Sequence, residues 1–126
     1  MKRIFSLLLG MLGFMFVSRA QSSNDMKGSS PVQRAQRQSD AMKTKLGLDT
    51  VQYQKVYDIN LEYAQKGQVI MEDGGGKFAK YRKFKSMMSE KDGKLKKVLT
   101  PDQYSSYQQM KKEMMDKAKE AYRDRQ

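Results

Sequence analysis

The clearest helix start in the sequence is Leu99-Thr100-Pro101-Asp102-Gln103. Thr100 can accept a hydrogen bond at the N-cap, Pro101 suits the first helical position, and Asp102 places negative charge at the positive end of the helix dipole. Apolar residues then follow at helical spacing, namely Tyr104, Tyr107, Met110 and Met114. The segment predicts an amphipathic helix that opens at Thr100.

A weaker copy of this pattern lies 51 positions earlier, at Leu48-Asp49-Thr50-Val51-Gln52. Asp takes the cap position here, and Asp caps a helix about as well as Thr. The leucine before each cap can pack back onto the following helix, and we expect the glutamines of the two copies to bond to each other. We interpret both copies as architecture, with these structural residues: Leu48, Asp49, Gln52, Leu99, Thr100, Pro101 and Gln103.

Two further helices are predicted around these starts. The first opens at Ser30-Pro31 and ends at Gly47, with an apolar seam formed by Val32, Ala35, Ser39, Met42 and Leu46. The second of the four helices extends from about 50 to about 71, and Gly67 should make its later half fray or bend. The run Gly74-Gly75-Gly76 predicts a flexible hairpin connection.

The third predicted helix extends from about 77 to 98 and carries the apolar stripe Phe78, Tyr81, Phe84, Met88, Leu95 and Val98. This stripe lapses near Lys91-Asp92-Gly93, which favours a kink or a pause in packing there. No segment alternates apolar and polar residues long enough to predict a strand. The predicted fold class is all-α, a four-helix hairpin-like domain.

The first twenty residues have the pattern of a signal peptide. Lys2 and Arg3 precede a nearly unbroken apolar run over 4–17, and Ser18-Arg19-Ala20 offers small residues for cleavage near Ala20-Gln21. The run is shorter than the roughly 20 residues that span a bilayer. We therefore predict an exported protein with this division: 1–20 signal peptide, 21–29 disordered arm, 30–122 helical domain and 123–126 frayed C-terminus.

Cysteine and histidine are absent from the chain. Disulfides, thiol nucleophiles, imidazole bases and the commonest metal ligand are thereby excluded. The Met87-Met88 and Met114-Met115 pairs could bind copper(I), but at helical spacing they are more typical of core filling. We expect no catalytic, cofactor or metal site, and no enzymatic activity.

The predicted mature chain has little aliphatic material for a core. From Gln21 onward it contains 14 Leu, Ile, Val and Phe residues, beside eight Met and seven Tyr. A monomer with such a core would be marginally stable. We therefore expect a homodimer in which the long helices bury their stripes against a second subunit.

Positive charge is concentrated in the third predicted helix. Residues 77–97 carry nine Lys and Arg against two acids, whereas the mature chain has a net charge of +8. Contact with nucleic acid is disfavoured by export, and binding to an anionic membrane surface is a secondary possibility. A solvated face without function and a surface for unfolded or acidic polypeptide remain. The candidate client-binding residues are Lys77, Phe78, Lys80, Tyr81, Arg82, Lys83, Phe84, Lys85 and Met88.

The repeated pattern resembles the Leu-Thr-x-x-Gln (LTxxQ) motif of the Spy/CpxP-like exported helical proteins. The surrounding segments 55–60 (Lys-Val-Tyr-Asp-Ile-Asn) and 95–99 (Leu-Lys-Lys-Val-Leu) are similar to those of small members from Bacteroidetes-type bacteria. The resemblance covers about residues 40–115, and the first copy departs from it by having Asp49 where the family usually has Thr.

This resemblance implies a four-helix hairpin that forms an intertwined, cradle-shaped dimer in the periplasm. It implies an ATP-independent chaperone for unfolded or misfolded envelope proteins. The alternatives are an adaptor that inhibits the periplasmic domain of an envelope-stress sensor kinase, or a structural envelope protein without clients. Metal-binding relatives depend largely on His, which this chain lacks.

Overall fold

The computed structural model describes residues 28–125 of the chain. This part contains four α-helices and no strand: α1 (Pro31–Leu46), α2 (Thr50–Glu72), α3 (Lys77–Val98) and α4 (Pro101–Arg123). The all-α class and the four predicted helices are thus confirmed. The predicted signal peptide and most of the predicted arm lie outside the described residues.

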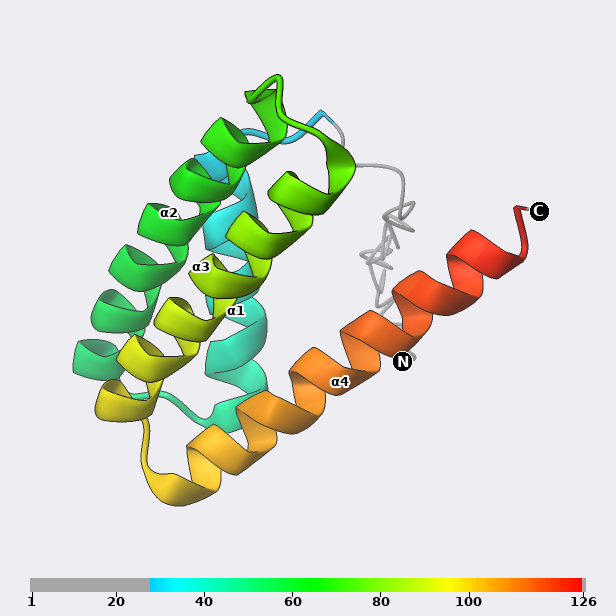
Figure 1. Cartoon of the computed structure of the whole chain (residues 1–126). Helices are drawn as coiled ribbons and strands as arrows, with labels where there is room; N and C mark the ends of the chain where they lie inside the picture. The colour runs from blue at the N-terminus through cyan, green and yellow to red at the C-terminus, as the bar shows by residue number, and fades with distance from the viewer. Residues whose placement is uncertain (1–27, 126) are drawn as a thin grey trace, which may run out of the picture.

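The first three helices lie side by side, and α4 crosses one end of them before leaving in another direction (Figure 1). α2 packs along both α1 and α3, whereas α4 contacts α1 and α3 over a short length. The two connections that carry the repeated motif, α1–α2 and α3–α4, meet at this end. We call this end, residues 46–53 and 98–104, the closed end.

The hydrophobic core is centred near the closed end. Leu48 and Leu99, the leucines before the two caps, are each 6% exposed and belong to the same cluster. Val56 and Leu95 are completely buried between them and the rest of the bundle. The core cluster comprises Met42, Leu46, Leu48, Val56, Leu95, Leu99 and Tyr107. The predicted leucine packing is therefore confirmed.

Gly67 does not act as a break in α2. The helix continues from Thr50 to Glu72, and Gly67 is buried where α3 approaches it. A β-carbon at this position would lie 3.7 Å from the Met87 side chain and 3.8 Å from that of Phe84. The expectation of fraying or bending was wrong, because the surroundings of this glycine support the helix.

The predicted lapse in α3 near Lys91-Asp92-Gly93 was also wrong. The helix is continuous from Lys77 to Val98, and Lys91 is only 4% exposed. The inward line of α3 is Met87, Lys91 and Leu95, so Met87 rather than Met88 enters the core. In α1, Val32 is 52% exposed and does not belong to the buried seam, whereas the other four predicted seam residues are buried.

Candidate functional site

The two motif copies form N-terminal capping boxes. The Gln52 backbone N–H donates to Asp49 Oδ1 over 2.7 Å, and the Asp49 N–H donates to Gln52 Oε1 over 3.3 Å. Thr100 and Gln103 repeat this exchange at 3.2 and 3.0 Å. Each box satisfies two N–H groups that the first turn of a helix leaves without a partner.

The glutamines of the two boxes also bind each other. Gln52 Nε2 donates to Gln103 Oε1 over 2.7 Å, and Gln103 Nε2 donates to Gln52 Oε1 over 3.2 Å. The second N–H of each amide donates to the carbonyl of the last residue of another helix. Gln52 donates to Val98 of α3 and Gln103 to Leu46 of α1, each over 3.3 Å. Each amide thus uses all four of its hydrogen-bonding positions.

This arrangement confirms that the glutamines bond across the two copies. It joins the starts of α2 and α4 to the ends of α1 and α3 in one network. Neither glutamine amide is left with free capacity for a substrate, so we interpret the motif residues as stabilising the fold. The structure also contains a third box, Ser30 with Gln33, which the sequence reasoning missed. Its signal was present, since Ser30-Pro31-Val32-Gln33 has the cap, proline and glutamine spacing of Thr100-Pro101-Asp102-Gln103.

A second polar cluster joins α3 to α4 beyond the closed end. The Tyr107 hydroxyl donates to Asp92 Oδ1 over 2.8 Å, and the Lys111 ammonium is bonded to Asp92 Oδ2. Burial, followed by the bond to Asp92, raises the pKa of Tyr107. We call these three residues the Asp92 cluster. The Asp92 cluster was not predicted from the sequence, because the apolar stripe of the third helix was expected to be interrupted at Asp92.

Lys91 lies beside this cluster and is buried. Its ammonium donates to Gln38 Oε1 over 3.0 Å, the one protein partner that the described residues give it. Burial lowers the pKa of Lys91 to about 8, against a smaller opposing effect of Asp92. A buried ammonium with one partner destabilises the fold at neutral pH, because burial disfavours the charged form.

All candidate client-binding residues except Met88 lie on the first half of α3, which we call the basic face (Lys77–Lys85). Its aromatic side chains are strongly exposed: Phe78 by 84%, Tyr81 by 66% and Phe84 by 44%. Lys83 pairs with Asp73 at 2.7 Å, which lowers the pKa of Asp73, and Lys80 donates to the Met71 carbonyl over 3.2 Å. Within residues 28–125, Lys77, Arg82 and Lys85 form no ion pair.

The structure thus brings the predicted face together along α3, with two qualifications. Phe84 leans partly over Gly67 of α2, and Met88 is half-buried rather than exposed. The remaining aromatic and basic side chains are exposed except Lys80, which is partly buried, and Lys80 and Lys83 bond to Met71 and Asp73 near the α2–α3 connection. Exposed apolar residues beside unpaired cations are typical of an interaction surface.

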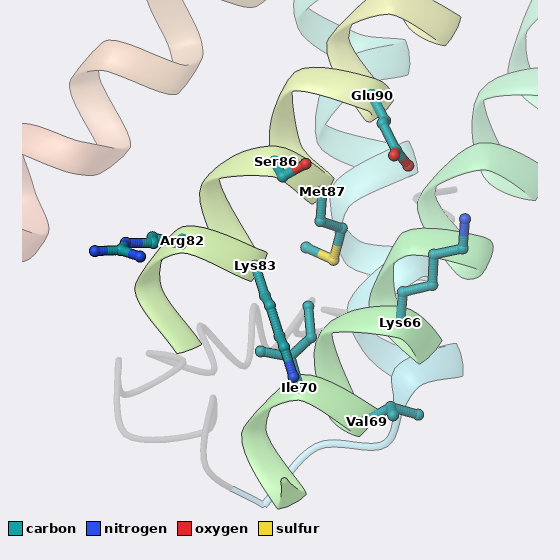
Figure 2. A pocket seen from close by; sticks show the side chains of 8 residues that line it. All are labelled: Lys66, Val69, Ile70, Arg82, Lys83, Ser86, Met87 and Glu90. Atoms are coloured by element: carbon teal, nitrogen blue, oxygen red, sulfur yellow. The ribbon is translucent and has the colours of Figure 1, made fainter. Parts of the chain in front are cut away.

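A groove of about 550 Å³ lies between α2 and the basic face (Figure 2). Figure 2 shows Ile70 and Met87 approaching each other across its floor, and cations at its rim. Lys66 on that rim pairs with Glu62 at 3.0 Å, and Lys94 bonds the same carboxylate. These bonds lower the pKa of Glu62, with Lys94 the larger contribution. The lining residues are Lys66, Val69, Ile70, Arg82, Lys83, Ser86, Met87 and Glu90.

Within the part of the chain that is described, no three acidic side chains gather in a way that could hold a metal ion. Among the same residues, no helix has both the length and the apolar character needed to cross a membrane. Of the predicted arm, Gly28 and Ser29 are described. The Ser29 carbonyl accepts a hydrogen bond from Arg34 over 2.6 Å, and Arg34 also donates to Gln68 on α2.

Residues 20–107 match the family described as a domain of unknown function (DUF4890), and the chain belongs to this family. The match begins at Ala20 and ends at Tyr107, the one buried residue of α4. It includes both motif copies and the basic face. No curated protein and no solved structure matches the chain.

Proposed function

We propose that the protein is an exported, ATP-independent chaperone that binds unfolded envelope proteins through the basic face of α3. The observation that carries the proposal is the exposure of Phe78 and Tyr81 beside three cations without an ion pair. Aromatic groups supply apolar contact to many sequences, and the cations attract acidic segments and speed the encounter.

The proposal extends to the homodimer expected from the sequence, intertwined and cradle-shaped as the Spy/CpxP-like resemblance implies. Support comes from α4, in which Tyr107 alone is buried. Met114 and Met115 are 49% and 55% exposed, which is unusual for side chains on an amphipathic helix of one chain.

No catalytic role is proposed. The glutamines of the closed end bond to each other, and Asp92 of the Asp92 cluster is bonded to Tyr107 and Lys111 across two helices. Binding needs neither nucleotide nor cofactor, and the exposed face offers adaptable contacts without a fixed substrate geometry.

The test is suppression of aggregation of a chemically unfolded model protein without nucleotide. The chain is expressed at full length, and mass spectrometry of the purified protein checks cleavage near Ala20-Gln21. One variant carries Phe78→Ser and Tyr81→Ser, and another carries Lys77→Gln, Arg82→Gln and Lys85→Gln. Each should require at least fivefold more protein for the same suppression.

The control is Arg37→Gln, Lys45→Gln and Lys55→Gln, which removes the same charge from exposed positions on α1 and α2. It should suppress aggregation like the unmodified chain. Equal activity of all variants, or no suppression by the unmodified chain at excess, would overturn the proposal. An adaptor for one sensor domain would leave aggregation of the model protein unchanged, as would a structural envelope protein without clients.

A further inference from the structure

Each of the first three helices carries one buried polar residue in its inward line. Ser39 of α1 and Asn60 of α2 are completely buried, and Lys91 of α3 is 4% exposed. Asn60 Nδ2 donates to Ser39 Oγ over 2.9 Å. Lys91 donates over 3.0 Å to Gln38, which precedes Ser39 in α1. The three residues therefore lie at one level of the bundle, and we call them the polar layer.

Apolar packing differs on the two sides of this layer. The members of the core cluster in α1, α2 and α3 all lie on the side of the closed end. On the other side, residues 77–90 of α3 bury one apolar side chain, that of Met87, which is 7% exposed. Met87 meets Gly67, which has no side chain, and Figure 2 shows it facing Ile70 across the groove. The first half of α3 therefore has little apolar contact with α2.

The polar contacts of this half of α3 are exposed to water. Lys83 pairs with Asp73 at 2.7 Å, but the two side chains are 56% and 45% exposed. Lys80 donates to the Met71 carbonyl over 3.2 Å, also at an exposed position. Exposed pairs of this kind stabilise a fold only slightly, because water competes for both partners. They therefore hold the first half of α3 weakly.

Lys91 favours release of this half. Its ammonium is buried and has Gln38 as its one partner within the described residues, so two of its N–H donors lack a protein acceptor. Burial of an ammonium with so few partners is costly, and exposure to water would restore its hydration. The next residue, Asp92, is bonded to Tyr107 and Lys111 of α4. The boundary between a releasable and a fixed part of α3 thus falls between residues 91 and 92.

We infer that residues 77–91 of α3 detach from α2 as one unit while the rest of the bundle stays folded. Native proteins open locally in such units, and the part with the fewest buried apolar contacts opens most readily. One side of α2 stays covered, because Arg34 of α1 donates to the Ala64 carbonyl over 3.3 Å and to Gln68 over 2.9 Å. The opening exposes Met87 and transfers the Lys91 ammonium to water.

The test uses the absence of cysteine from the chain, which lets one introduced thiol report on one position. Met87→Cys places the thiol in the opening unit, and Met42→Cys makes the same change in the core cluster, where Met42 is 1% exposed. Alkylation of the folded, full-length expression product by iodoacetamide is followed by mass spectrometry. Met87→Cys should react at least a hundredfold faster, and urea should accelerate its reaction less steeply, because local opening exposes less surface than global unfolding.

Circular dichroism checks that both variants are folded. Val56→Cys, at a completely buried position of the core cluster, replaces Met42→Cys if that variant loses its helices. Equal alkylation rates with equal urea dependence in the two regions would overturn the inference, since residues 77–91 would then unfold only with the whole bundle.

The contribution of Lys91 is tested in the Met87→Cys chain. Adding Lys91→Met continues the apolar line and leaves no ammonium to hydrate, so alkylation should slow at least tenfold. Adding Lys97→Met removes an equal charge at an exposed position of the same helix and should leave the rate unchanged. An unchanged rate with Lys91→Met would show that the opened state does not release Lys91, which contradicts the inferred boundary.

The opening also affects the proposed client site, and this consequence rests on the proposed function. When residues 77–91 detach, Phe84 and Met87 add apolar surface beside the exposed aromatic side chains of the basic face. Lys91→Met should therefore require at least twofold more protein for equal suppression of aggregation. If it slows alkylation but leaves suppression unchanged, the opening stands and its effect on client binding is refuted. If the unmodified chain suppresses nothing, the proposed function fails while the alkylation rates still test the opening.

Discussion

At the closed end, Leu48 and Leu99 are each 6% exposed and Gln52 and Gln103 use every hydrogen-bonding position they have. On the basic face and on the exposed second half of α4 (residues 112–123, the α4 arm), Phe78 is 84% exposed and Met114 is 49% exposed. Both regions consist of amphipathic helices with apolar residues at helical spacing. The difference is that neighbouring helices of the same chain cover one region and diverge at the other. Helical periodicity therefore identifies a face to be covered, but does not show whether the cover comes from the same chain.

The largest expected contrast between the two regions is in their contribution to stability. Leu95→Ala should lower the free energy of unfolding by about 2–5 kcal/mol, because the side chain is fully buried beside the closed end. Phe78→Ala should change it by less than about 0.5 kcal/mol in dilute protein. Urea unfolding followed by circular dichroism measures both. Similar losses would show that Phe78 is covered within one chain.

The glutamine pair should account for much of the rigidity of the closed end. Gln103→Glu keeps the shape but replaces both N–H donors by an acceptor, so the Leu46 carbonyl loses the Gln103 donor and Gln52 Oε1 keeps only the Asp49 N–H. We expect a loss of about 2–4 kcal/mol in urea unfolding. Gln65→Glu, at an exposed position of α2, is the control and should have little effect. A Gln103→Glu variant as stable as the control would mean that the pair is dispensable.

Because of Lys91, the free energy of unfolding should increase as the pH rises above neutral. Its pKa is about 8 in the folded chain and 10.5 when unfolded, so the folded state binds fewer protons between these values and stability rises with pH in that window. Lys91→Met should remove this rise and stabilise the fold by up to about 3 kcal/mol at pH 7. Urea unfolding of both proteins at pH 7, 9 and 10.5 tests this. Parallel pH curves would contradict the burial of the charge.

The smallest expected change in stability is that of a substitution at Gly67. Gly67→Ala should stabilise α2 by about 0.5–1 kcal/mol, since a methyl group there would make ordinary contact with Met87 and Phe84. Thermal unfolding is sufficiently sensitive to detect it. Destabilisation instead would mean that α2 and α3 approach more closely than the structure shows.

The helix starts and ends were predictable from sequence because they depend on local chemistry. Caps, prolines and glycines determined all four helices, and even the bond between the glutamines followed from the repetition of one pattern. The buried side of α3 was harder to predict from the sequence than the helix ends. The prediction used apolar residues only and so passed over Lys91, whose long apolar stem is buried while its ammonium reaches Gln38.

The Asp92 cluster could not be predicted for a related reason. Its bonds connect positions 15 and 19 apart in the sequence, and they depend on the angle at which α4 leaves the bundle. No local signal encodes that angle. The basic face was recognisable from composition, whereas its separation from the α4 arm of the same chain required the structure.

The central claim is that the basic face and the α4 arm are covered by another polypeptide. Hydrogen exchange measured residue by residue in dilute and in concentrated protein tests it most directly. Amides of α2 and of α3 near Leu95 should exchange slowly in both samples. Amides 78–85 and 112–122 should exchange quickly when dilute and at least tenfold more slowly when concentrated. Exchange in these segments that is slow in dilute monomer, or equally fast at every concentration, would contradict the account.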